Sequence, residues 1–115
     1  MNDAGLIQNL IVTGCKTVSV IHSVAGAERS NHYHREDSHY LFVLRGEMHY
    51  WERPAGSEAE PTFTVVHEGE MIFTPAMVEH TVRFPMRTTL ISMAALDRSH
   101  EAHEADVVRV KCLAP

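Results

Sequence analysis

Short apolar or alternating runs recur along this chain of 115 residues, and turn-forming sequences separate them. The turns include Arg45-Gly46, Arg53-Pro54-Ala55-Gly56, Glu68-Gly69 and Pro75-Ala76. Many short strands with turns at this spacing are typical of an antiparallel sandwich or barrel. The pattern therefore predicts an all-β fold. At this length we expect a single domain, residues 1–115, with one hydrophobic core.

The predicted strands follow the apolar runs and are placed at residues 6–13, 17–22, 39–44, 47–52, 63–67, 70–74, 80–84 and 88–93. A long loop is expected over residues 53–61, which are rich in Glu, Gly and Pro. The C-terminal tail, residues 97–115, should begin with a turn or short helix at 97–105. Val107, Val108 and Val110 then predict a last strand.

Composition excludes several classes of partner. The net charge is -5 and the ten basic residues are scattered, which argues against a nucleic-acid surface. No apolar run approaches the roughly 18 residues that a membrane span needs. The acidic start Met1–Gly5 is unlike a signal peptide, so we expect a cytoplasmic protein. Cys15 and Cys112 are expected to be reduced thiols, and a disulfide between them stays open.

Four histidines indicate a metal site. His32, His34 and His39 stand close together, and His80 follows much later. His32 and His34 are two residues apart, so their side chains point to the same face of a β-strand. An all-β scaffold builds a metal site from such a pair and further imidazoles on other strands. The first hypothesis is therefore metal chemistry.

The spacing around these histidines resembles the first motif of the cupin superfamily. That motif is Gly, five residues, His-x-His, three or four residues, Glu, six residues, Gly. The chain reads Gly26, five residues, His32-Tyr33-His34, four residues, His39, six residues, Gly46. Every position fits except that His39 stands where the family has Glu.

A second cupin motif is similar to the segment from Gly69 to Phe84. That motif is Gly, five residues, Pro-x-Gly, two residues, His, three residues, Asn. The chain reads Gly69, five residues, Pro75-Ala76-Met77, two residues, His80, three residues, Phe84. Met77 replaces the second Gly of the motif and Phe84 replaces the Asn. The two motifs together span a core of residues 26–84.

The resemblance implies a cupin jelly-roll barrel with a metal in its mouth. It also implies the ligands by position: His32, His34, His39 and His80. Imidazole suits a divalent transition metal such as Fe, Zn or Ni. A neutral imidazole in place of Glu leaves the full +2 charge on the metal, so the site should be more Lewis acidic.

Three alternatives stay open for this site. His39 could lie outside the ligand set, which leaves three histidines. Glu36 or Asp37, in the turn between His34 and His39, could supply a carboxylate. The histidines could also be hydrogen-bonded in a polar pocket that binds no metal.

Other candidates come from position alone. His49 alternates with Met48 and Tyr50 on a strand, so it could line the barrel mouth as a catalytic acid or base, or be an exposed or core histidine. Three arginines, Arg29, Arg83 and Arg87, could anchor an anionic substrate or lie on the surface. His100 and His103 are interpreted as part of a solvated tail, with metal binding as the alternative.

The function expected from the resemblance is that of a metal-dependent cupin. We expect an enzyme that activates a small oxygen-bearing substrate, for example a sugar or small acid, by dioxygenase, isomerase, cyclase or lyase chemistry. The alternative is a non-catalytic cupin that binds a small molecule or assists another enzyme. Cupins commonly pair, so we expect a homodimer, formed through the apolar runs 6–12 and 107–110.

Overall fold

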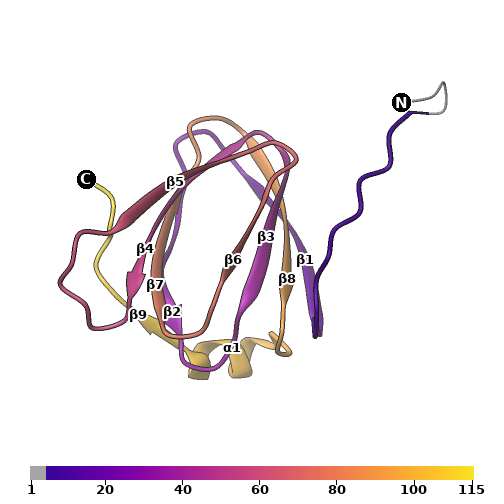
Figure 1. Cartoon of the computed structure of the whole chain (residues 1–115). Helices are drawn as coiled ribbons and strands as arrows, with labels where there is room; N and C mark the ends of the chain where they lie inside the picture. Colours follow the sequence, from indigo (N-terminus) through magenta and orange to yellow (C-terminus); the bar gives the residue numbers. More distant parts are fainter. Residues whose placement is uncertain (1–4) are drawn as a thin grey trace.

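The strands of this protein form two antiparallel sheets (Figure 1). The computed structural model describes residues 5–115, without the side chain of His100, so the start at residues 1–4 that suggested no signal peptide lies outside it. The elements are β1 Thr17–Ser23, β2 Glu28–His34, β3 His39–Arg45, β4 Glu47–Pro54, β5 Thr62–His67, β6 Met71–Thr74, β7 Val78–Arg83, β8 Thr88–Ala94, α1 His100–Asp106 and β9 Val107–Arg109.

The two sheets face each other and enclose the core. One has the order β1-β8-β3-β6 and the other β5-β4-β7-β2-β9. This arrangement confirms the predicted all-β jelly roll. Buried apolar side chains from both sheets form one cluster, consisting of Leu41, Val43, Met48, Tyr50, Val66, Val82, Phe84 and Leu90. Phe84, at the position of the motif's Asn, is 1% exposed and belongs to this core.

An irregularity in β2 sets the direction of its histidines. Ser30 and Asn31 have φ angles of 74° and 56°, and the register with β7 shifts between Ser30 and His32. The Thr81 hydroxyl donates a hydrogen bond to Asn31 Oδ1 at 2.8 Å and holds this bulge. After the shift, His32 pairs with His80. The bulge therefore re-aims the side chains of β2, as bulges near functional sites often do.

Two strands differ from the prediction. Residues 6–13 form no strand, although they were predicted as one, and diverge from the sheets beyond the start of β1 (Figure 1). Leu6, Ile7 and Ile11 are all at least 80% exposed, so the apolar run buries little against its own chain. Strand β2 was missed because histidine and serine occupy positions where the prediction looked for apolar residues.

The C-terminal tail follows the prediction more closely. Helix α1 covers one end of the sandwich, near the ends of β2 and β3 (Figure 1). Strand β9 then pairs with β2, with His32 opposite Arg109 and His34 opposite Val107. The tail thus brings a helix and a strand to the end of the barrel that carries the motif histidines. No helix among the described residues is long and apolar enough to cross a membrane.

Gly46, at the tight turn between β3 and β4, generates a stability prediction. Its φ is +101°, and an added Cβ would lie 2.7 Å from Arg87 O and 2.9 Å from Thr88 Cα. Backbone atoms cannot move aside cheaply, so Gly46→Ala should destabilise the fold by about 2–4 kcal/mol in urea unfolding. Gly56 is the matched control because its φ is +79° but nothing lies within 4 Å. Gly56→Ala should cost only about 1 kcal/mol, and equal losses would contradict the close approach.

Candidate metal centre

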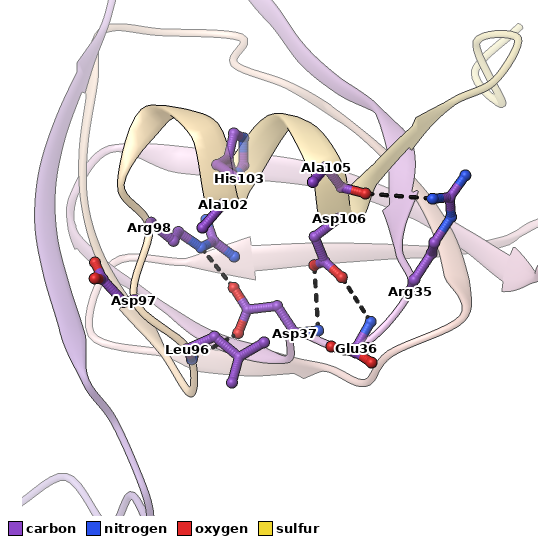
Figure 2. Close-up of a pocket in the computed structure, with 10 residues that line it drawn as sticks. All are labelled: Arg35, Glu36, Asp37, Leu96, Asp97, Arg98, Ala102, His103, Ala105 and Asp106. Atoms are coloured by element: carbon purple, nitrogen blue, oxygen red, sulfur yellow. Dashed lines mark hydrogen bonds and ion pairs between the residues drawn. The ribbon is translucent and has the colours of Figure 1, made fainter.

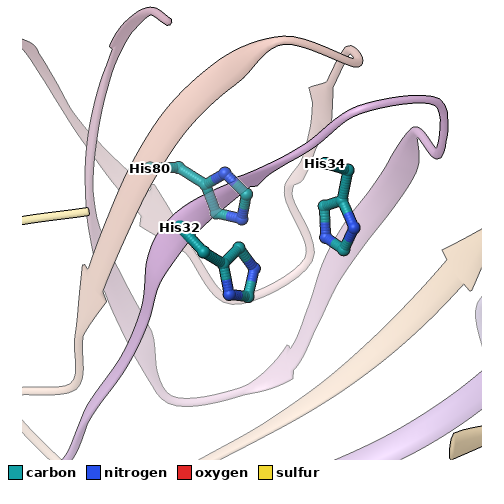
Figure 3. A group of neighbouring side chains, drawn as sticks. All are labelled: His32, His34 and His80. Atoms are coloured by element: carbon teal, nitrogen blue, oxygen red, sulfur yellow. The ribbon is translucent and has the colours of Figure 1, made fainter. Parts of the chain in front are cut away.

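Three of the motif histidines converge between the sheets (Figure 3). His32 and His34 come from β2, and His80 comes from the neighbouring strand β7. The ring centroid of His32 lies 4.8 Å from that of His34 and 4.8 Å from that of His80. One nitrogen atom from each ring lies within 4.8 Å of the others. This spacing is close enough for a single ion to bind all three after small side-chain movements.

Hydrogen bonds at Nδ1 orient two of these rings. His34 Nδ1 donates to Asp106 Oδ2 at 3.1 Å, and His80 Nδ1 donates to the carbonyl of Val78 at 3.0 Å. A neutral imidazole carries one proton, so in both rings the lone pair is on Nε2. The Nε2 of His34 faces a terminal nitrogen of Arg98 at 3.5 Å. Metal-binding histidines typically have such a partner at the other ring nitrogen. His80 Nε2 is buried and has no hydrogen-bond partner in the described chain, so the donor set fits a transition metal.

His39 lies beside this group but makes a different contact. Its ring centroid is 5.3 Å from that of His80 and 5.6 Å from that of His34. Arg98 donates to His39 Nδ1 at 2.9 Å, so Nδ1 is an acceptor and the ring proton belongs on Nε2. His39 Nε2 is buried without a partner among the described residues. In this arrangement His39 has no free lone pair to offer a metal.

Burial keeps the imidazoles neutral. Burial and then repulsion from His80 lower the pKa of His32 to about 2, and burial lowers the pKa of His80 to about 4. The pKa of His39 is held well below its usual value by burial and by His80, and burial also lowers the pKa of His34. The neutral form is the one that binds a metal.

Asp106, at the end of α1, connects the helix to the strand that carries His34. Its carboxylate accepts a hydrogen bond from His34 Nδ1. It also accepts from Glu36 N and Asp37 N (Figure 2). Burial alone would raise the pKa of Asp106, but these hydrogen bonds outweigh it and hold the pKa below its usual value. Asp106 therefore acts as the anionic partner behind His34. Sequence analysis missed it because it is 72 residues away in the chain.

Asp37 serves a similar purpose for Arg98. Its buried carboxylate accepts from Arg98 Nε at 2.8 Å and from Leu96 N at 3.0 Å. A cavity of about 350 Å³ adjoins these groups and α1 (Figure 2). One oxygen of Asp37 lies within 4.8 Å of donor atoms of His34 and Asp106, but these groups already have hydrogen-bond partners. Asp37 therefore holds Arg98, whereas Glu36 is exposed.

His103 of α1 is a fifth histidine at this end of the barrel. Its ring centroid lies 5.6 Å from that of His34 and 6.3 Å from that of His32. The sequence interpretation placed His103 in a solvated tail, and the structure instead places it beside the motif histidines. The pairing of β9 with β2 brings α1 and His103 to this end of the barrel. No local sequence pattern predicts this long-range pairing.

The remaining candidates lie elsewhere. His49 projects from β4 on the side opposite the buried Met48 and Tyr50, and its Nε2 contacts Glu47 at 2.8 Å. The fold therefore does not bring His49 to the other histidines, and its catalytic role stays a prediction. Arg83 pairs with Glu28 at 2.8 Å. Cys15 and Cys112 are free thiols.

The turn before β7 retains the backbone shape of the family motif. Met77 replaces the motif's Gly, yet its φ is 62°, a left-handed conformation that Gly adopts more easily. Met77 N donates to His34 O at 2.8 Å, and Ala55 N donates to Met77 O at 2.9 Å. These bonds hold the strained turn next to His34 and lead the chain into His80.

Two antiparallel sheets around buried histidines define a jelly-roll protein with a candidate metal centre. A family model described as a cupin domain matches residues 19–92. The chain therefore belongs to the cupin family, as its motifs indicated. No curated protein matches it.

Solved structures share the fold at low sequence identity. CapF, a capsular polysaccharide assembling protein from Staphylococcus aureus, is 18% identical with a TM-score of 0.73 over 82% of this chain and 26% of that chain. QdtA, a 3,4-ketoisomerase from Thermoanaerobacterium thermosaccharolyticum in complex with TDP, is 19% identical with a TM-score of 0.70 over 83% of this chain and 66% of that chain. CENP-C of Drosophila melanogaster bound to CAL1 is 16% identical with a TM-score of 0.59 over 67% of this chain and 60% of that chain. This chain thus spans less than two thirds of each of these chains.

The neutral histidines predict that stability falls in acid. The unfolded chain takes up protons below the ordinary histidine pKa of 6.5, whereas folded His80 does not until about pH 4. The unfolded state then binds more protons, so the free energy of unfolding decreases as the pH falls from 6.5 toward 4. His80 alone should contribute on the order of 3 kcal/mol of this loss.

Urea unfolding of the chelator-treated protein at several pH values between 8 and 4 measures this loss. His80→Gln should flatten the pH dependence in the same range. An equally steep dependence in that variant would contradict a buried neutral His80.

Proposed function

We propose that this protein is a metal-dependent cupin enzyme in which His32, His34 and His80 bind a divalent transition metal, such as Fe, Zn or Ni. The observation that carries the proposal is the buried Nε2 of His80, which has no hydrogen-bond partner among the described residues. A nitrogen from each of the other two rings lies within 4.8 Å of a His80 nitrogen. Leaving such a lone pair buried and unpaired costs about 1–3 kcal/mol. Binding a metal removes this cost.

His39 as a fourth ligand remains a prediction. A neutral imidazole cannot accept the Arg98 hydrogen bond at Nδ1 and also present a lone pair at Nε2. His39 could bind through Nε2 only if the Arg98 guanidinium moved away from Nδ1. The proposal therefore rests on three ligands, with His39 held beside them by Arg98.

The protein would orient the ligands of this metal and limit their contact with water. When bound, the metal would polarise an oxygen atom of a substrate or, as iron, activate O2. Asp106 and the Val78 carbonyl fix the protonated nitrogens of His34 and His80. The burial of His34 and His80 limits their contact with bulk water, which strengthens electrostatic interactions within the site.

The size of the neighbouring cavity favours a small substrate. A cavity of about 220 Å³ between the sheets is lined in part by His32, His39 and His103. Pockets for drug-sized ligands are usually about 300–1,000 Å³. QdtA and CapF are described as a sugar isomerase and a polysaccharide assembling protein. These relatives support an oxygen-bearing substrate, and the cavity favours one smaller than a nucleotide sugar.

Elemental analysis of protein purified without added metal tests the proposal. We expect about one transition metal per chain. His80→Ala should lower metal affinity by at least about 10–100-fold, the cost known for losing even a partner behind a ligand. His39→Ala should lower it less than His80→Ala does. His67→Ala is the matched control, because His67 is 63% exposed at the side chain and lies near Glu47.

Retention of the metal at full affinity by His80→Ala would overturn the three-ligand centre. The identity of the bound metal also distinguishes between the candidate reactions. Iron with O2 uptake would identify a dioxygenase, and zinc or nickel without O2 uptake would favour isomerase, cyclase or lyase chemistry. Binding of small molecules without turnover would identify the non-catalytic alternative.

We further propose that residues 1–115 act as one cupin domain and that two copies form a homodimer. Leu6, Ile7 and Ile11, in the segment that leads into β1, are exposed. Val18 and Val20 of β1 are 65% and 60% exposed. This apolar surface on an edge strand supports pairing with a second copy. A monomer in analytical ultracentrifugation would contradict the dimer.

A further inference from the structure

We propose that the 220 Å³ cavity between the sheets, called here the inter-sheet cavity, recognises a small carboxylate through Arg98 and Arg29. This inference rests on the proposed function, because the cavity adjoins the proposed metal ligand His32. It narrows the substrate from any oxygen-bearing compound to a small organic acid.

The charge of the residues that line the inter-sheet cavity supports binding of a carboxylate. Arg29 and Arg98 both line the inter-sheet cavity, and none of the described residues that line it is acidic. The other titratable groups in the wall are His32, His39 and His103, which are basic or neutral. A cavity lined by cations without a carboxylate of its own favours an anion inside it.

Arg98 has capacity to bind such an anion. Asp37 accepts from its Nε at 2.8 Å, and His39 Nδ1 accepts from one terminal nitrogen at 2.9 Å. The same terminal nitrogen lies 3.5 Å from His34 Nε2. The other terminal nitrogen has no hydrogen-bond acceptor among the residues and side chains that the structure describes. Asp37 is buried behind Arg98 and holds its guanidinium in place. A positioned guanidinium binds carboxylates well because its planar array of N–H groups matches two oxygens.

Arg29 is a second cation that lacks an ion-pair partner in the part of the chain that the structure describes. Its Nε donates to Ser23 Oγ at 2.9 Å, and one terminal nitrogen donates to His22 O at 3.3 Å. Both acceptors are neutral and Arg29 is exposed, so no carboxylate among the described residues pairs with its charge. Sequence analysis had named Arg29, Arg83 and Arg87 as equal candidates, and only Arg29 lines this cavity.

The other residues that line the inter-sheet cavity indicate the chemical nature of the rest of the acid, beyond its carboxylate. Ile21, Leu41, Val82 and Leu90 contribute aliphatic surface, and Ser30 and Ser92 add hydroxyl groups. A short aliphatic or hydroxylated body fits this lining better than a large polar one. Arg98 already pairs with Asp37, so a neutral sugar would leave the Arg29 guanidinium without a charged partner, whereas a carboxylate would pair with it.

Binding of monocarboxylates of two to seven carbons, each compared with its primary amide, tests this inference. Chemical shifts of the isotope-labelled full chain would be recorded with each probe, first after chelation and then with zinc added. The metal-free protein tests the arginines alone, and metal content is measured separately. We expect at least one acid to bind about 10-fold or more tightly than its amide, the size of a charged hydrogen bond. The perturbed signals should come from the cavity wall.

Variants assign the preference to its residues. Arg98→Gln should abolish the preference for acid over amide, and Arg29→Gln should reduce it. Arg45→Gln is the matched control, because it removes one exposed arginine at the far end of β3. Equal affinity for acids and amides, no acid binding at all, or a preference that survives Arg98→Gln would overturn the inference. Metal binding that persists in those cases would leave the proposed function standing.

Discussion

Two imidazole nitrogens, Nε2 of His39 and Nε2 of His80, are buried between the sheets without a hydrogen-bond partner among the described residues. Buried polar atoms are usually paired, and each unpaired one costs about 1–3 kcal/mol. The Nδ1 contacts decide what each ring offers. His80 gives its proton to a carbonyl and presents a lone pair, whereas His39 accepts from Arg98 and presents an N–H group. Two histidines in one cluster therefore have opposite chemical roles.

The surroundings of the cluster depend on this division. Asp106 reaches back from α1 to His34 and to the backbone of Glu36 and Asp37, so the C-terminal tail is part of the centre. Asp37 in turn holds Arg98 against His39. The Asp106 carboxylate therefore orients His34, and the Asp37 carboxylate orients the Arg98 guanidinium. Asp106 and Asp37 both hold other side chains in place, and neither lines the inter-sheet cavity, whose described wall contains no acidic residue.

The sequence predicted the fold class and the positions of the motif histidines because turn residues and histidine spacing are local patterns. Strand β2 escaped the apolar pattern because its inward residues include His32 and His34, which serve the centre instead of the core. Sequence reasoning tends to fail at such functional positions. Arg98, His103 and Asp106 were missed because long-range pairing of the tail with β2 brings them to the centre. The run at 6–13 was wrong as a strand, since no partner strand within the described chain covers it.

X-ray absorption spectroscopy on the metal of the purified protein tests the central claim most directly, because it reports the ligands themselves. The account predicts imidazole scattering from at least three histidines at a metal–nitrogen distance of about 2.0–2.1 Å for zinc, with oxygen atoms completing the coordination. A metal surrounded by oxygen or sulfur ligands, with one histidine or none, would contradict it.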